Sequence, residues 1–165
     1  MSFAVINNFL HLLATVTWIG GMIFMNIVLF PAQTAIDPGQ RGKLFGAIVK
    51  RFLIIVWISV IVLLLTGLYK TPSYLLFNPE SGFGFWLTVK HIAILLMILF
   101  GLLITFVVSP KLRKLAPKPG DQPLPEFIKA QKNMTLLART NMTLGIIVLF
   151  CVSMMQYNRA KGTNF

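Results

Sequence analysis

Four long stretches of uncharged, mostly apolar residues alternate along the sequence with polar segments that are rich in proline and basic residues. These stretches cover about 4–30, 52–69, 85–109 and 138–156. A helix of about 20 apolar residues crosses the roughly 30 Å hydrocarbon core of a bilayer. The pattern therefore predicts an all-α fold, a four-helix integral membrane bundle that forms one transmembrane domain over residues 1–165.

Prolines mark the expected ends of these helices. All nine prolines fall outside the four stretches, and Pro31 and Pro110 directly follow the first and the third. Proline lacks the backbone N–H that a helix needs and its ring crowds the preceding turn. We therefore expect the first helix to end before Pro31 and the third before Pro110.

The composition is that of a membrane protein, and the distribution of the basic residues predicts its orientation in the membrane. The chain is 56% hydrophobic with a mean hydropathy of +0.79, and only 12% of its residues are charged. A net charge of +11 is typical of proteins that bind nucleic acid, but eleven of the fifteen Lys and Arg residues lie in 31–51 and 110–139. Basic loops of this kind are typical of the cytoplasmic side of a membrane. We predict a bacterial inner (plasma) membrane protein with both of these loops in the cytoplasm, both termini outside and no nucleic-acid partner.

The chain has few acidic residues and one cysteine. All four acidic residues are predicted to lie in loops: Asp37, Glu80, Asp121 and Glu126. We therefore expect no relay of carboxylates inside the membrane, and this disfavours an ordinary proton-coupled transporter. Cys151 is the single cysteine, so the chain forms no internal disulfide and carries no CxxC motif. No catalytic residue is assigned.

The two histidines are the leading candidate ligands. His11 and His91 lie in the first and third stretches, at similar depths below the same predicted outer boundary. Two imidazoles on separate helices at equal depth suit the axial ligation of haem b. The alternative is two unrelated histidines that hydrogen-bond to backbone carbonyls or to interfacial water.

Lys90 directly precedes His91 and has two interpretations. Its long side chain can reach the outer headgroups at this depth. Alternatively, it meets a haem propionate or an acidic substrate group inside the bundle.

The methionines are a second set of candidate metal ligands. Met154 and Met155 lie near the outer end of the fourth stretch, on the side of the two histidines. Thioethers are soft ligands that suit Cu(I), but methionine is also a flexible packing residue. Three more methionines lie deeper in the spans: Met22, Met25 and Met97. Asn26 and Asn141 are expected to hydrogen-bond between helices.

Several segments resemble known membrane proteins. These are LHLLATVTWIGGMIF (10–24) followed by Phe30-Pro31, GFWLTVKHIAILL (84–96) and ARTNMTLGIIVL (138–149). With four spans, they resemble the small four-helix branch of the copper-resistance protein D (CopD) family and, more distantly, the HemJ-type protoporphyrinogen oxidases.

The resemblance implies roles for particular residues. His11 matches the first-helix histidine that HemJ-like proteins use for haem b, and Lys90 matches their third-helix lysine. His91 has no clear counterpart there, and Asn141 is followed by Met-Thr in place of an acidic residue and a proline. The CopD resemblance implies copper handling at the outer face.

Three functional hypotheses follow. The leading one is a membrane b-type haem protein with His11 and His91 as axial ligands, serving electron transfer or a quinol- or porphyrin-linked oxidation. Besides the bilayer, its expected partners are a quinone, a porphyrin or a redox protein, within a homo-oligomer or a larger complex. The second hypothesis is a copper-binding or copper-transport protein that uses the same histidines with Met154 and Met155. The third is a non-catalytic membrane anchor subunit.

Overall fold

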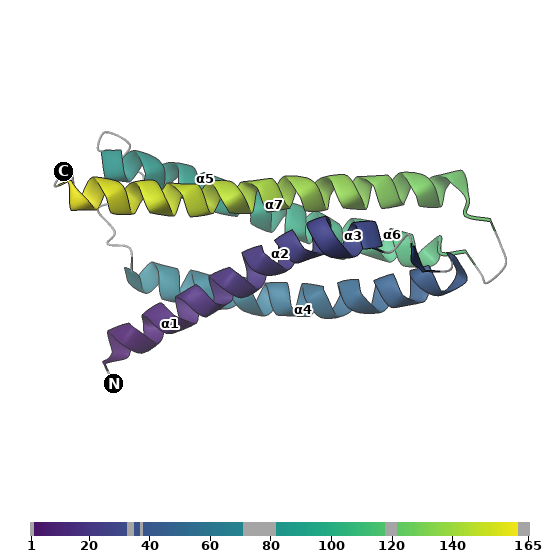
Figure 1. Cartoon of the computed structure of the whole chain (residues 1–165), viewed down its shortest axis with the longest axis horizontal. Helices are drawn as coiled ribbons and strands as arrows, with labels where there is room; N and C mark the ends of the chain where they lie inside the picture. Colours follow the sequence, from purple (N-terminus) through teal and green to yellow (C-terminus); the bar gives the residue numbers. More distant parts are fainter. Residues whose placement is uncertain (1, 33–34, 37, 71–81, 118–121, 162–165) are drawn as a thin grey trace.

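The computed structural model describes residues 2–32, 35–36, 38–70, 82–117 and 122–161. These residues are almost entirely helical and include no β-strand. The helices run side by side in one elongated bundle (Figure 1). Four of them are long and apolar enough to cross a membrane. The all-α, four-helix membrane fold predicted from the sequence is confirmed.

The first spanning helix runs over Phe3–Ala32 and consists of five consecutive segments. In order, these are α1 (Phe3–Thr15), η1 (Val16–Gly20), α2 (Gly21–Phe24), η2 (Met25–Leu29) and α3 (Phe30–Ala32). The second is α4 (Pro38–Lys70). The third consists of α5 (Gly82–Leu103), η5 (Ile104–Val108) and α6 (Ser109–Lys114), and the fourth is α7 (Pro125–Ala160). The η segments are π-helical turns within otherwise continuous helices.

The expected helix ends at Pro31 and Pro110 are wrong, because helical structure continues through both prolines. Pro31 lies in α3 and Pro110 in α6. Each follows a π-helical turn: η2 precedes Pro31 and η5 precedes Pro110. A proline ring clashes with the carbonyl four residues earlier, and a widened turn at that point relieves the clash. The local change in helix geometry therefore carries the chain past the proline.

The helices also extend beyond the apolar stretches. Helix α4 begins at Pro38 and α7 at Pro125, each more than ten residues before the apolar stretch predicted for it at 52–69 or 138–156. Glu126, assigned to a loop from the sequence, lies exposed in the first turn of α7, where a carboxylate interacts favourably with the helix dipole. The other acidic residues, Asp37, Glu80 and Asp121, lie outside the described residues.

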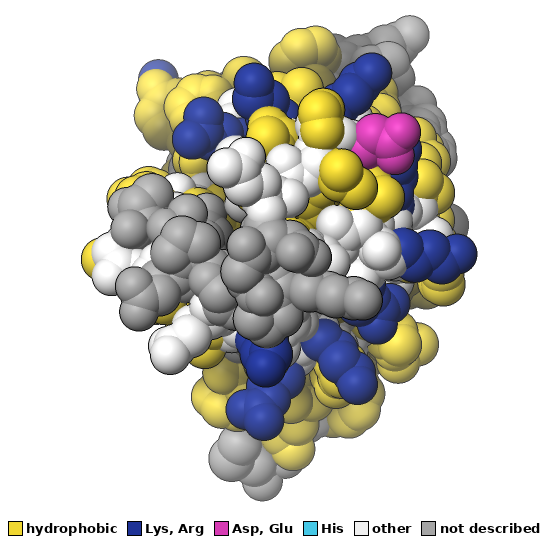
Figure 2. Space-filling model, turned by 90° about the vertical axis from the view of Figure 1, so that its right-hand side faces the viewer, with side chains coloured by type: hydrophobic (Ala, Val, Ile, Leu, Met, Phe, Trp, Pro, Cys, Tyr) yellow, Lys and Arg dark blue, Asp and Glu magenta, His cyan; other side chains and the backbone are white. Residues whose placement is uncertain are grey.

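The bundle has two ends that differ in charge. We call the end with Phe3, Lys70, Gly82 and Ala160 the terminal end, because both chain termini lie there (Figure 1). The opposite end is the basic end. Figure 2 shows basic side chains spread around this end, with an acidic side chain among them. Eight of its exposed basic residues are Lys43, Lys50, Arg51, Lys111, Arg113, Lys114, Lys129 and Lys132. The cytoplasmic placement of this end remains a prediction from its charge.

Helix packing joins two pairs. Helix α1 packs along α4, and α5 packs along α7. The middle of the first span crosses over, so that η1, α2 and η2 contact α7 while α1 diverges from α7 toward the terminal end (Figure 1). Two buried clusters fill the interior. The central cluster is Trp18, Ile19, Met22, Val56, Val60, Ala93, Met97 and Val148. The basic-side cluster is Met25, Phe30, Val49, Ile104 and Met134.

Candidate functional site

His11 is held against α4 by a hydrogen bond that orients its imidazole. Its Nδ1 lies 2.7 Å from the Thr66 hydroxyl oxygen. That hydroxyl donates its own proton to the carbonyl of Val62 at 2.6 Å. When the Thr66 hydroxyl donates to the Val62 carbonyl, His11 Nδ1–H is the donor and the Thr66 oxygen the acceptor of the bond between them. Nε2 of His11 is then the deprotonated ring nitrogen, the form in which a histidine binds a metal.

Polar groups near the terminal end support this arrangement. Asn7 is buried one turn before His11, and its side-chain amide donates to the Thr66 carbonyl at 3.4 Å. Gly67 lies beside the imidazole, since a Cβ built at this position would be 3.7 Å from His11 Cε1. Lys70 donates to the side-chain oxygen of Asn8. The interface of α1 and α4 therefore sets the position of His11.

Lys90 lies half-buried among the helices of the terminal half. Its ammonium group interacts electrostatically with His11 on α1, Lys70 on α4 and the fully buried Cys151 on α7. It forms no hydrogen bond with a residue that the structure describes. Both interpretations of Lys90, as a residue that reaches the headgroups or one that acts inside the bundle, stay predictions.

His91 belongs to the other helix pair. It is half-buried on α5, which packs along α7. His11 instead hydrogen-bonds to Thr66 of α4. The two histidines therefore lie in different helix pairs, and their pairing as axial ligands stays a prediction.

Met154 and Met155 are half-buried on α7 near the terminal end. Among the described residues, no group of three His, Cys, Asp or Glu side chains is placed to hold a metal ion. A metal site within this part of the chain therefore needs ligands of another kind. Among the buried side chains, methionine sulfur is the most frequent of these.

A cavity of about 50 Å³ lies at the crossing of the first span with α4, α5, η5 and α7. Its wall combines apolar residues with sulfur and amide groups, and six of its residues carry chemistry: Trp18, Met22, Met25, Asn26, Met134 and Asn141. The side-chain nitrogen of Asn26 donates to the carbonyls of Met22 at 2.8 Å and Ala138 at 3.4 Å. The second of these bonds joins the first span to α7, as the sequence predicted for Asn26.

The sequence does not predict that these residues share one cavity. It places Met22 and Met25 deep in the first span and predicts interhelical hydrogen bonds for Asn26 and Asn141, but it assigns no role in a cavity to Trp18 or Met134. The spacing of Trp18, Met22, Met25 and Asn26 along one helix was a usable signal, since residues three and four apart share a face.

The family model for copper resistance protein D matches residues 46–155. The chain belongs to the CopD family. It is thus a membrane protein of a family related to copper resistance. No curated protein and no solved structure matches the chain. The match covers Lys90, His91 and both candidate methionines of α7 but not His11, and it carries no link to the HemJ-type enzymes.

Proposed function

We propose that this CopD-family protein binds Cu(I) inside the bilayer and passes it between the two membrane faces. Membership of the family supports a connection with copper. One observation carries the proposal further, namely a row of soft, uncharged donors along the interior of the bundle.

The row begins at the terminal end with Nε2 of His11. Thioethers follow toward the basic end: Met22 and Met97 in the central cluster, then Met25 and Met134 in the basic-side cluster. All four sulfur-bearing side chains are at most 5% exposed. Thioether and imidazole are ligands that favour Cu(I), and spaced neutral donors let a monovalent ion move without a carboxylate relay.

The positive charges around His11 favour release of a bound copper ion over its retention. Lys70 and Lys90 both act on the His11 imidazole. Two positive charges near a cation ligand weaken its hold on the cation. An entry site in a transport path must release its ion, so this weakening favours transfer toward the methionines.

Copper fits the interior cavity better than haem does. The cavity of about 50 Å³ accommodates an ion with a water molecule. A porphyrin is several times larger. The orientation of His11 would equally suit an axial haem ligand at the terminal end, so the test must separate the two cofactors.

The test uses the full chain, purified in detergent and reconstituted into liposomes that contain a Cu(I) indicator. We expect uptake of thiol-buffered Cu(I) that exceeds uptake by empty liposomes and falls about tenfold or more in His11→Ala. His91→Ala is the matched control and should retain uptake. Absorption spectra of the oxidised and dithionite-reduced protein, purified from haem-supplied cells, are recorded in parallel.

Two outcomes contradict the proposal. A reduced spectrum with sharp haem bands and no copper uptake would restore bis-histidine haem ligation as the leading hypothesis. Absence of both copper uptake and a haem spectrum would favour the anchor-subunit hypothesis instead.

A further inference from the structure

The basic end carries an excess of cationic side chains. Eight exposed basic residues of this end come from three helices: three lie on α4, three on α6 and two on α7. None of these side chains forms a hydrogen bond or an ion pair with a residue that the structure describes. Within the described ranges, Glu126 is the one acidic residue. Unpaired charges of one sign at one end of the molecule favour an anionic partner.

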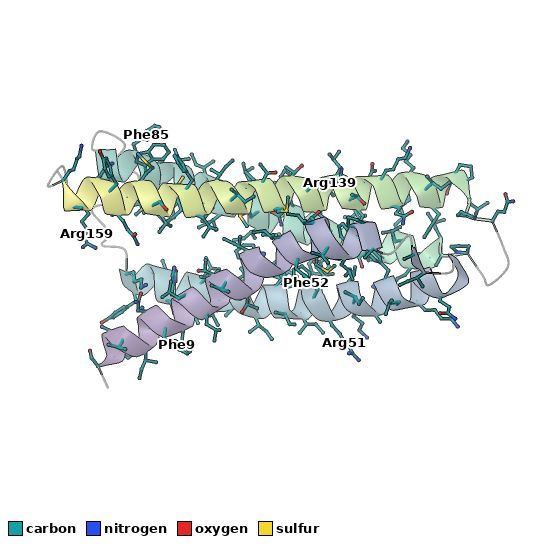
Figure 3. All side chains as sticks on the ribbon, viewed as in Figure 1. Phe9, Arg51, Phe52, Phe85, Arg139 and Arg159 are labelled. Atoms are coloured by element: carbon teal, nitrogen blue, oxygen red, sulfur yellow. The ribbon has the colours of Figure 1, made fainter. Side chains whose placement is uncertain are left out.

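These residues surround the bundle. Figure 2 shows basic side chains on several sides of the basic end and not on a single face. In Figure 3, Arg51 of α4 and Arg139 of α7 lie on opposite sides of the bundle at a similar position along its axis. A docked soluble protein covers one patch of its partner's surface, whereas lipid headgroups encircle a transmembrane bundle. A ring of cations therefore fits a layer of anionic headgroups better than it fits one protein partner.

Helix lengths place this ring at the depth of the headgroups. On α4, the exposed Arg51 lies about 19 residues from the exposed Lys70. On α7, the exposed Arg139 lies about 20 residues from the exposed Arg159. At about 1.5 Å per residue, both separations are roughly 30 Å, which is the thickness of the hydrocarbon core. Two helices thus place a basic residue at each boundary of the core.

The outermost basic residues stay within reach of the headgroups. Lys43 and Lys132 lie about eight and about seven residues farther out on the same two helices, which adds roughly 10–12 Å. The headgroup layer on one side of a bilayer is about 5–8 Å thick, and a lysine side chain can bend back toward it. The basic residues from Arg51 to Lys43 and from Arg139 to Lys132 therefore span the layer that holds the lipid phosphates.

Apolar side chains beside these lysines also favour a lipid interface. Leu44 follows Lys43 on α4 and is 46% exposed, and Ile128 precedes Lys129 on α7 and is 42% exposed. Exposure of an apolar side chain to water is unfavourable. At a membrane interface, the apolar side chain can insert below the phosphates while the neighbouring ammonium group binds them.

We propose that the basic end binds anionic phospholipid headgroups and gathers these lipids around the protein in one leaflet. Ammonium and guanidinium groups of α4, α6 and α7 pair with the phosphates of neighbouring lipids through charge-assisted hydrogen bonds. Arg51 and Arg139 mark the hydrocarbon side of this surface, and Lys43 and Lys132 mark its aqueous side. The surface is separate from the row of soft donors inside the bundle and requires no copper.

Spin-labelled lipids test this surface in bilayers that contain the full chain. Electron spin resonance measures how much phosphatidylglycerol and how much phosphatidylcholine is immobilised at the protein. We expect phosphatidylglycerol to associate about threefold or more strongly at low salt. The preference should nearly vanish in about 1 M NaCl, where the Debye length is about 3 Å. Both leaflets contain the labelled lipid, so the orientation of the reconstituted protein does not affect the result.

The variant Lys43→Gln/Lys111→Gln/Lys129→Gln removes one charge from each helix and should lower the preference about twofold or more. The matched control, Lys43→Arg/Lys111→Arg/Lys129→Arg, keeps the charge and should keep the preference. Equal association of the two lipids with the wild type overturns the proposal and leaves an acidic soluble protein as the partner. An unchanged preference in the glutamine variant, or its loss in the arginine variant, also overturns it. If the glutamine variant does not fold, Lys50→Gln/Arg113→Gln/Lys132→Gln also removes one charge from each helix and replaces it.

Discussion

The Thr66 hydroxyl takes part in two hydrogen bonds, accepting from His11 Nδ1 and donating to the Val62 carbonyl. It therefore sets both the tautomer and the direction of the imidazole. Residues that orient a metal-binding histidine typically change metal affinity about 10- to 100-fold when they are lost. At this scale, the chemistry of the terminal end depends on a residue of α4 that binds no metal itself.

We expect Thr66→Val to weaken Cu(I) binding about tenfold or more, because His11 loses the acceptor that holds its tautomer. Thr66→Ser keeps a hydroxyl and should bind nearly as the wild type does. Competition titration against a Cu(I) chelator measures both affinities. Equal affinities for the valine and serine variants would show that this hydrogen bond does not prepare His11 for metal.

Lys90→Met should strengthen Cu(I) binding at His11 roughly three- to tenfold, because it removes a positive charge that acts on the imidazole and keeps most of the side-chain volume. Lys50→Met, at the exposed basic end, is the charge-matched control and should have no effect. The same competition titration reports both variants. Weaker binding in Lys90→Met would instead indicate that Lys90 positions the site.

At the scale of the helices, the first spanning helix lines the interior cavity where it crosses the other helices. It begins beside α4, crosses to α7 at its middle and passes through two π-helical turns. Small residues permit this crossing. A Cβ built on Gly145 of α7 would lie 3.2 Å from the Met22 methyl group. The close approach of helices at small residues is a common feature of membrane bundles. Figure 3 shows Phe52 of α4 at the place where the first span crosses α4.

Gly20 and Gly21 provide a matched pair for testing this crossing. A Cβ on Gly21 would lie 2.5 Å from the Phe52 ring, whereas one on Gly20 would meet nothing within 4 Å. We expect Gly21→Ala to destabilise the bundle by about 1–3 kcal/mol through crowding, offset by about 1 kcal/mol of helix propensity. Gly20→Ala should gain that propensity alone. Thermal unfolding in detergent, followed by circular dichroism, measures both, and equal stability of the two variants would contradict close packing at Gly21.

At the scale of the whole molecule, charge and apolar surface are separated along the bundle axis. Large apolar side chains cover the sides of the helices, as a lipid environment requires, and basic side chains surround one end. The terminal end holds the histidines and both chain termini. Copper would therefore meet His11 at the end opposite the basic one.

The positive-inside rule predicts that the basic end faces the cytoplasm. In a Cys151→Ala background, a membrane-impermeant maleimide should label Ser2→Cys on intact cells. It should label Lys114→Cys only after the membrane is opened. The reverse pattern would invert the topology and place the His11 end in the cytoplasm.

The amino-acid sequence is sufficient to predict the number of spanning helices, their approximate positions and the charge difference between the two ends. It could do so because a chain in lipid must satisfy its backbone hydrogen bonds internally, so that length and hydropathy suffice to predict helices. The sequence also predicts that Asn26 hydrogen-bonds to another helix, and the structure shows that this helix is α7.

Which residues face each other cannot be predicted from the sequence and follows from how the helices pack. The spanning segments are apolar on every side, so periodicity does not tell an inward face from a lipid-facing one. Met25 is buried, for example, while Ile27 two residues later is 62% exposed. The hydrogen bond of His11 with Thr66 and the position of Met22, Met25 and Met134 around one cavity depend on helix rotation and crossing. The passage of the helices through Pro31 and Pro110 depends on π-helical turns, which arise from local backbone packing rather than from hydropathy.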